Sequence, residues 1–260
     1  GAYLSTVLAS AAVAASGDCK ASANGLASFA EGARGALVPA SAITGTAAAG
    51  GGWVLEGTAR VLSLQSADLL VIGFNDGATT RFALLDARGA GISRTVQACT
   101  DLTRDAGILE LSSVAVGSDA ILEGLGATRV ETLQACLLAV EAAGVTRWAV
   151  EAATEYAKLR EQFGSAIGSF QAVKHKCANL LITAELAAAA AWSAVVSLEQ
   201  DEDQQKLAAG AAVQAAVTPS AEAVTEAVTI FGGIGFTWEH DAHLYWRRAM
   251  TLAALVPALN

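Results

Sequence analysis

The segment Tyr156–Gln171 carries the side chains best suited to bind a nucleotide. Arg160 offers a planar fork of donors that matches a pyrophosphate, and Phe163 can lie against the face of an adenine ring. Far downstream, Gly232 and Gly233 have no side chain and would let backbone N–H groups approach a bound cofactor. Together these residue types suit a dinucleotide.

The same residues also allow a purely structural interpretation. Arg160 can form an ion pair with Glu155 or Glu161 at a helix end, and Phe163 can belong to a hydrophobic core. In that case the segment would only end one helix and begin the next.

The cysteines and histidines predict no metal site. The chain has four cysteines, and they lie far apart: Cys19, Cys99, Cys136 and Cys177. This spacing favours buried thiols in a reducing cytoplasm. His240 and His243 are three residues apart on a predicted helix, but no third ligand accompanies them.

The composition of the 260 residues predicts a folded protein of closely packed helices. Hydrophobic residues make up 53% of the chain and charged residues 16%, which excludes intrinsic disorder. The net charge of −9 argues against nucleic acid or an anionic membrane surface as the main partner. We predict no membrane span, because Pro39 interrupts the uncharged stretch 35–55 and the Ala-rich run after Glu185 ends at Leu198.

The first two parts of the chain differ in the period of their apolar residues. Residues 1–35 show helical spacing at 3–15 and 19–29, with Asp18 as the expected N-cap, and we interpret them as the remnant of an N-terminal helical domain. Because residues 1–17 lack a basic segment, we expect no signal peptide there. Residues 36–123 predict a small antiparallel β-domain, with strand patterns at 53–55, 69–72, 81–85 and 109–114 and a hairpin turn at 75–77.

Residues 124–260 predict a helical bundle. Three long patterns with helical spacing cover 127–159, 169–198 and 202–231, and a shorter one opens near Glu239. Gly164, Gly168 and the pair Gly232 and Gly233 mark the breaks between them. Interleaved Ala and Leu let such helices approach closely, as an up-down bundle requires.

Two motifs in this half resemble those of the acyl-CoA dehydrogenase family. The run Tyr-Ala-Lys-Leu-Arg-Glu-Gln-Phe-Gly-Ser-Ala-Ile-Gly-Ser-Phe-Gln at 156–171 is similar to a segment that joins two bundle helices of that family, and Phe-Gly-Gly-Ile-Gly-Phe at 231–236 resembles its Gly-Gly-x-Gly-Phe loop. Weaker similarities lie at 52–58, 67–68 and 86–93. The resemblance implies an α+β, mainly α fold with partial N-terminal helices, a small antiparallel β-domain and a C-terminal four-helix up-down bundle.

The resemblance also implies a cofactor site. In the family these positions hold the adenine and pyrophosphate end of an FAD that belongs to the neighbouring subunit. The residues implied to bind it are Arg160, Gln162, Phe163, Gln171, Thr229, Gly232 and Gly233. Thr229 stands where the family usually has Gln.

The catalytic base of the family is missing. Desaturation of an acyl thioester needs a carboxylate that removes the α-proton while a hydride passes to the flavin. The family's usual position for it, counted from Arg247, falls at Val256, and the alternative position used by some members falls at Gln134. Neither side chain can act as a base, so we assign no catalytic residue. Glu131 could substitute, although a Glu near a helix start is more often a surface residue, and Glu141 is a weaker candidate.

The residues that would hold the flavin ring are altered as well. The family's Thr-Glu-Pro-x-x-Gly-Ser-Asp loop corresponds to residues 37–42, where only Pro39 remains. Its second flavin strand corresponds to residues 60–63, which contain no aromatic side chain to cover the ring.

Three hypotheses follow for the function. The first is a non-catalytic subunit of a heteromeric acyl-CoA dehydrogenase, with FAD shared with a second acyl-CoA dehydrogenase-like subunit in an α2β2 assembly. Within the family such assemblies are associated with actinobacterial breakdown of steroid side chains as CoA thioesters, with electron-transfer flavoprotein as the expected acceptor. The second is a self-sufficient homotetramer that uses Glu131 as base, and the third is a non-enzymatic helical scaffold. In each case we expect a cytoplasmic protein with no nucleic acid or membrane partner.

Overall fold

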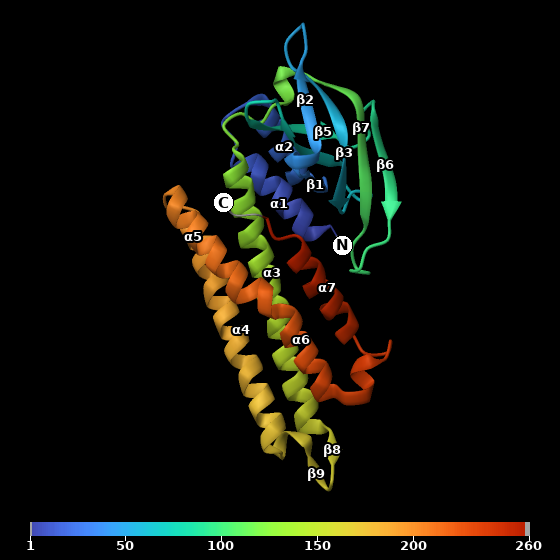
Figure 1. Cartoon of the computed structure of the whole chain (residues 1–260), viewed down its shortest axis with the longest axis vertical. Helices are drawn as coiled ribbons and strands as arrows, with labels where there is room; N and C mark the ends of the chain where they lie inside the picture. Colours follow the sequence, from blue (N-terminus) through green and yellow to red (C-terminus); the bar gives the residue numbers. More distant parts are fainter. Residues whose placement is uncertain (1, 258–260) are drawn as a thin grey trace. The chain divides into compact units, whose positions relative to one another are not determined.

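The computed structural model describes residues 2–257 and is drawn in Figure 1. Gly1 and residues 258–260, which form the outer limits of the predicted domains, lie outside the described part. The chain divides into two compact units, 1–133 and 134–260. The first unit contains both the N-terminal helices and the β-sheet, and the separate origin predicted for residues 1–35 stays a prediction.

Two helices open the first unit. They are α1 (Tyr3–Ala14) and α2 (Lys20–Ala30), close to the predicted 3–15 and 19–29. The predicted N-cap Asp18 was wrong, because the residue before the first turn of α2 is Cys19, whose backbone N–H donates to Ser22 Oγ at 3.2 Å. A side chain three residues into the helix thus satisfies a donor at its start.

The sheet of the first unit has seven strands. They are β1 (Gly35–Val38), β2 (Ile43–Ala47), β3 (Trp53–Leu62), β4 (Leu69–Asn75), β5 (Thr80–Asp86), β6 (Ile92–Gln97) and β7 (Ala106–Val116), and short 3₁₀ turns occupy η1 (Ala40–Ala42) and η2 (Ser118–Ala120). The predicted hairpin joins β4 to β5. Most pairs are antiparallel as expected, but β4 also pairs in parallel with β1 and, at one position, with β2.

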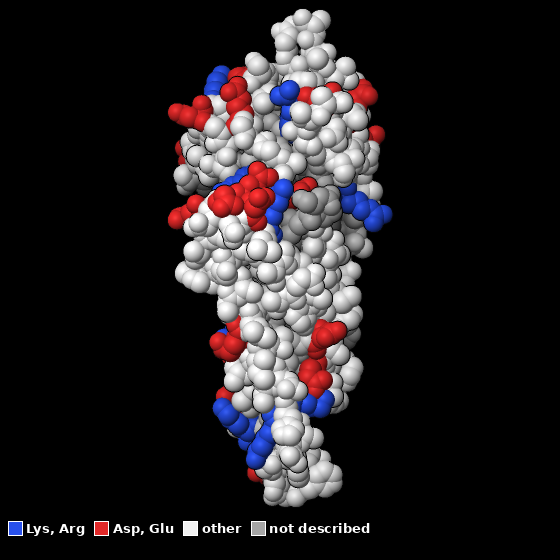
Figure 2. Space-filling view, turned by 60° about the vertical axis from the view of Figure 1, so that its left-hand side comes forward, with Lys and Arg blue, Asp and Glu red and all other residues white. Residues whose placement is uncertain are grey.

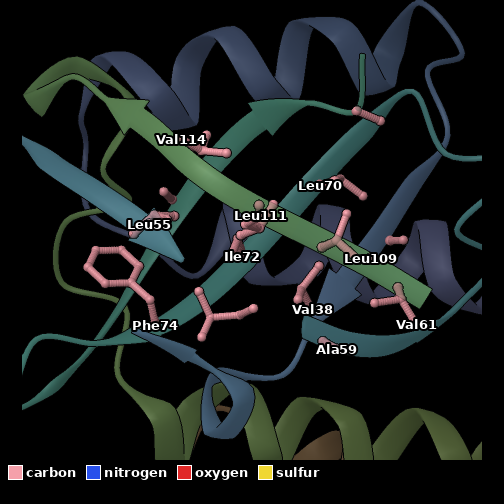
Figure 3. Packing of buried hydrophobic residues seen from close by; sticks show 14 of the residues in the cluster. Val38, Leu55, Ala59, Val61, Leu70, Ile72, Phe74, Leu109, Leu111 and Val114 are labelled. Atoms are coloured by element: carbon pink, nitrogen blue, oxygen red, sulfur yellow. The ribbon is translucent and has the colours of Figure 1, made fainter. Parts of the chain in front are cut away.

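The core of this unit lies on both faces of β4, which explains why that strand is a continuous apolar run. Leu70 and Ile72 point to one face, where they pack with residues of β3 and β7 such as Leu55 and Leu109 (Figure 3). Val71 points to the other face and packs with side chains of α1. Successive residues of a strand alternate in direction, so both faces must be covered.

The second unit is the helical bundle, entered through α3 (Ala127–Leu159), whose bounds equal the prediction. A small hairpin, β8 (Glu161–Gln162) and β9 (Ser165–Ala166), and η3 (Ile167–Ser169) lead to α4 (Gln171–Ser197). The predicted helix 202–231 is a continuous rod with a π-helical turn inside: α5 (Glu202–Ala212), η4 (Val213–Val217) and α6 (Thr218–Phe231). The turn η5 (Gly232–Phe236) and α7 (Ala242–Ala254) complete it.

The last helix begins later than predicted. α7 starts at Ala242, so His240 lies before the helix and not on it, and its Nδ1 accepts a hydrogen bond from the Ala242 backbone N–H at 3.1 Å. His240 and His243 therefore do not share a helical face. Within residues 2–257 no group of three or more His, Cys, Asp or Glu side chains could hold a metal ion.

Candidate cofactor-binding end of the helical bundle

The β8–β9 hairpin is a two-residue turn that presents an aromatic side chain to solvent. Gln162 pairs with Ser165, and the turn residues Phe163 and Gly164 have φ of 54° and 77°. Both angles lie in the left-handed region, which matches a type I′ hairpin and is unusual for an aromatic residue. The Phe163 side chain is 94% exposed and contacts Phe170 edge-on at 6.2 Å.

The exposure of Phe163 contradicts the structural interpretation of this segment. Phe163 is not part of a core. Glu155, one of the two proposed partners of Arg160, instead forms an ion pair with Lys158 at 2.5 Å. Arg160 itself is exposed and forms no ion pair with any residue in 2–257. An exposed aromatic ring and a guanidinium without an ion pair are both available to a ligand at this edge.

The segment is anchored to α3 by backbone contacts. The N–H of Ile167 donates to the Arg160 carbonyl at 2.8 Å, which closes the hairpin at its base. A Cβ at Gly168 would lie 2.9 Å from the Ala157 carbonyl oxygen, so only Gly allows η3 to pack this closely on α3. Gln162 and Gln171 are both exposed, and Gln171 is the first residue of α4.

The glycine loop after α6 offers open space beside its backbone. Gly232 has φ of 66°, and a Cβ at Gly232 or Gly233 would meet no other described atom within 4 Å. Thr229 lies three residues before Gly232 and is exposed, and its hydroxyl donates to the Thr225 carbonyl at 3.0 Å. The hydroxyl is therefore held by its own helix.

Two contacts bring the hairpin and the glycine loop to the same end of the bundle. The rings of Tyr156, in the last turns of α3, and Phe231, at the end of α6, meet edge-on at 5.4 Å. Lys176, in the second turn of α4, forms an ion pair with Glu226 of α6. Figure 1 shows β8 and β9 at this lower end of the bundle. The structure thus gathers the predicted cofactor residues at one end.

The two positions that the resemblance assigns to a catalytic base also come together. Gln134 of α3 donates from Nε2 to the Leu255 carbonyl at 2.6 Å, and Leu255 adjoins Val256. A hydrogen bond between residues 121 positions apart had no signal in the sequence. This place therefore holds a neutral amide, a carbonyl and an aliphatic side chain, and none of them can remove a proton.

The other acidic candidates are held differently. Glu141, two turns beyond Gln134 on α3, forms a half-buried ion pair with Arg248 of α7. Further along the same two helices, Trp148 and Tyr245 stack at 3.6 Å. Glu141 therefore fastens α7 to α3. Glu131 is half-buried near the start of α3.

Two of the four residues that correspond to the family's flavin strand, Val61 and Ser63, are buried in the first unit. Ser63 has no exposed surface, a φ of 59°, and an Oγ that accepts from Ser5 Oγ of α1 at 3.0 Å. Val61 is 3% exposed. The only hydroxyl in residues 60–63 is therefore buried and already hydrogen-bonded.

The C-terminal half of the chain identifies its protein family. The family model described as acyl-CoA dehydrogenase, C-terminal domain, matches residues 117–255. The chain belongs to the acyl-CoA dehydrogenase family.

Curated relatives match about half of the chain or somewhat more. The acyl-CoA dehydrogenase FadE34 of Mycobacterium tuberculosis is 52% identical over 122 residues, which are 46% of this chain and 17% of that protein. The acyl-CoA dehydrogenase IpdE2 of Mycolicibacterium smegmatis is 34% identical over 157 residues, 60% of this chain and 46% of that protein. The chain thus spans less than half the length of these relatives.

Solved structures share the fold of nearly the whole chain. A variant of the Tcur3481-Tcur3483 steroid ACAD has a TM-score of 0.88 at 26% identity, covering 97% of this chain and 71% of that one. The ChsE4-ChsE5 complex of Mycobacterium tuberculosis has a TM-score of 0.84 at 24% identity over the same shares. The α+β, mainly α fold predicted from the sequence is confirmed.

Proposed function

We propose that this chain is a subunit of an FAD-dependent acyl-CoA dehydrogenase that supplies the adenine and pyrophosphate half of the FAD site while a second subunit supplies the base. The observation that carries the proposal is the Gln134–Leu255 hydrogen bond. It shows neutral groups at the two alternative positions where the family carries its catalytic base. When bound, FAD supplies the acceptor for the hydride from the acyl β-carbon.

The residues at the end of the bundle fit the adenine and pyrophosphate part of this cofactor. Arg160 presents its guanidinium with no partner in the described chain to compete with a diphosphate. Phe163 presents a ring face for stacking, and the open backbone at Gly233 lets N–H groups reach an anion. Gln162 and Gln171 add exposed amides that can donate to ribose or phosphate oxygens.

The isoalloxazine end does not fit this chain, which favours sharing FAD with an unlike subunit in an α2β2 assembly. The Ser63 hydroxyl is buried against Ser5, and Leu37 and Val38 offer no side-chain donors. Two structural neighbours support such an assembly, since their names describe a ChsE4-ChsE5 complex and a Tcur3481-Tcur3483 steroid ACAD. By analogy the substrate is an acyl-CoA thioester, with a steroid side chain as the favoured acyl group. The expected acceptor is an electron-transfer flavoprotein and the location is cytoplasmic.

Flavin content tests the proposal. The chain is purified alone and together with the second subunit, and FAD per chain is read from the visible spectrum. We expect the chain alone to hold little flavin and the complex to hold FAD and dehydrogenate acyl-CoA. A yellow homotetramer with about one FAD per chain would overturn the proposal.

The Glu131→Gln variant of the complex separates the proposal from the self-sufficient enzyme. We expect its activity to stay within a few fold of the wild type, since Glu131 is not placed as a base here. A loss of ~10³ with the flavin still bound would make Glu131 the base and this chain the catalytic one.

A further inference from the structure

The cofactor-binding end of the bundle is basic, although the chain as a whole is acidic. Residues 155–176 contain four Lys or Arg and two Glu, which leaves a net charge of +2 in a chain of net charge −9. The four cations are Lys158, Arg160, Lys174 and Lys176. Figure 2 shows several Lys and Arg side chains at this lower end of the bundle. A local excess of positive charge attracts an anionic ligand to a chain that would otherwise repel it.

Two of the four cations are already paired within the chain. Lys158 forms an ion pair with Glu155 at 2.5 Å, and Lys176 forms one with Glu226. Lys174 is exposed and, like Arg160, forms no ion pair with any residue in 2–257. Arg160 and Lys174 are therefore the two cations of this segment that a ligand can reach without competition from a carboxylate of the described chain.

Lys174 lies on the same side of the bundle end as the predicted cofactor residues. It is the fourth residue of α4, and its backbone N–H donates to the Phe170 carbonyl at 3.0 Å. The Phe170 ring in turn contacts Phe163 at 6.2 Å. Residues three and four apart share one face of a helix, and helical side chains lean toward its N-terminus. Lys174 therefore shares the face of α4 that begins at Gln171, beside the two phenylalanine rings.

This position is unfavourable for a cation in the chain alone. The start of a helix carries a partial positive charge, which acidic side chains stabilise and basic side chains oppose. The first turn of α4 contains no acidic residue, and Lys174 follows directly after it. A residue that breaks a local rule without a compensating contact indicates a binding role, and a bound anion would compensate both Lys174 and the helix end.

We propose that Lys174 binds the FAD pyrophosphate as a second cation beside Arg160, so that each of the two negative charges meets one positive charge. The inference rests on the proposed function and extends it, since Lys174 lies outside both motifs that predicted the cofactor residues. The two side chains contribute differently: Arg160 supplies a planar fork of donors, and Lys174 supplies a point charge on a flexible stem.

The dissociation constant of FAD for the purified complex tests the contact. Lys174→Ala should raise it roughly 2- to 5-fold at low ionic strength, the range expected for one exposed ion pair. Lys174→Glu changes the charge by two units, so the same factor should apply twice and give roughly 4- to 25-fold. Both effects should fade at about 1 M salt, where charges are screened within ~3 Å.

Lys206→Glu is the matched control for net charge. Lys206 lies on α5, which follows the far end of α4, and it is paired with Glu202 at 3.3 Å. This variant changes the charge of the chain as much as Lys174→Glu and should bind FAD like the wild type. An equal loss of affinity in both variants would show a general effect of net charge and overturn the proposal.

Competition by FAD fragments separates the phosphate contact from the adenine contact. ADP carries a diphosphate, whereas adenosine carries no phosphate. Lys174→Glu should weaken the competition of ADP with FAD and leave the competition of adenosine unchanged. Equal weakening of both fragments would mean that the variant disturbs the adenine site, and it would overturn the pyrophosphate contact.

The remaining outcomes distinguish this proposal from the proposed function. If Arg160→Ala weakens FAD binding and Lys174→Glu does not, the role of Lys174 is wrong and the proposed function stands. If neither variant weakens it, both are wrong. If Lys174→Glu separates the two subunits in the flavin-free complex, as measured by light scattering, Lys174 serves a protein contact and the pyrophosphate role is overturned.

Discussion

Replacing Arg160 by Ala should weaken FAD retention by the assembled complex without weakening the fold. The guanidinium is exposed and forms no ion pair within residues 2–257, so its removal breaks no contact that holds α3 or the β8–β9 hairpin. We therefore expect the free energy of unfolding of the chain to change by less than about 0.5 kcal/mol. Any effect on the flavin then reports binding.

The expected effect on affinity follows from the charges. A pyrophosphate carries two negative charges, and the guanidinium of Arg160 offers it a charged, forked donor. Hydrogen bonds to charged groups contribute about 1.5–3 kcal/mol, so the dissociation constant of FAD should rise roughly 10- to 150-fold. Arg160→Lys should recover only part of this, because an ammonium keeps the charge but not the fork.

The assay is FAD release from the purified complex, followed at several ionic strengths. Lys158→Ala is the matched control, since Lys158 is an exposed cation two residues away that is paired with Glu155. The control should release FAD like the wild type, and the salt dependence of binding should fall only in Arg160→Ala. An Arg160→Ala complex with wild-type flavin affinity would refute the cofactor role and favour the scaffold hypothesis.

Two further predictions concern the fold around the sites. Gly168→Ala should lower the free energy of unfolding by about 1–3 kcal/mol and loosen the hairpin, because its Cβ would lie 2.9 Å from the Ala157 carbonyl oxygen. Urea denaturation measures this change, and an unchanged unfolding midpoint would contradict the close packing of Gly168 on α3. Asp76→Asn should destabilise the β4–β5 hairpin at neutral pH. Hydrogen bonds from the backbone N–H groups of Thr79 and Ala78, and then from Arg81, hold the pKa of the Asp76 carboxyl below its usual range. The stability they contribute is present above about pH 4 and is lost as the pH falls below it, so the difference in melting temperature between wild type and variant should shrink from pH 6 to pH 3. A difference independent of pH would rule out this origin.

The helices could be predicted from the sequence because their signals are local. Apolar spacing placed α3 at its observed bounds and α4 to within two residues at its start. The strands β1, β2 and β6 were not predicted, because β1 has only four residues and β6 is an edge strand that is exposed on most of its length. Such strands are fixed by their partners, which local sequence does not contain.

The residues of the candidate site also divide into those with a local sequence signal and those fixed by distant contacts. Arg160, Phe163 and Gly232 were proposed as cofactor residues because their motifs are short and contiguous, and the structure brings the hairpin and the loop to one end of the bundle. The Gln134–Leu255 contact and the burial of Ser63 under Ser5 join segments far apart in the chain. They depend on how helices pack, and no spacing rule applied to one sequence reveals them.

The π-helical turn Val213–Val217 has a consequence for how this gene can change length. A π turn holds one residue more than an α turn over the same span. Loss of the codon for Gln214, an exposed residue of the turn, would let the rod close as a regular α-helix and leave α6 facing the same way. Loss of one codon within α6 before Thr229 would instead rotate the end of the rod by about 100° relative to the bundle. The π turn is therefore the place in this rod where the deletion of one residue is tolerated, because the orientation of the glycine loop relative to the bundle is preserved.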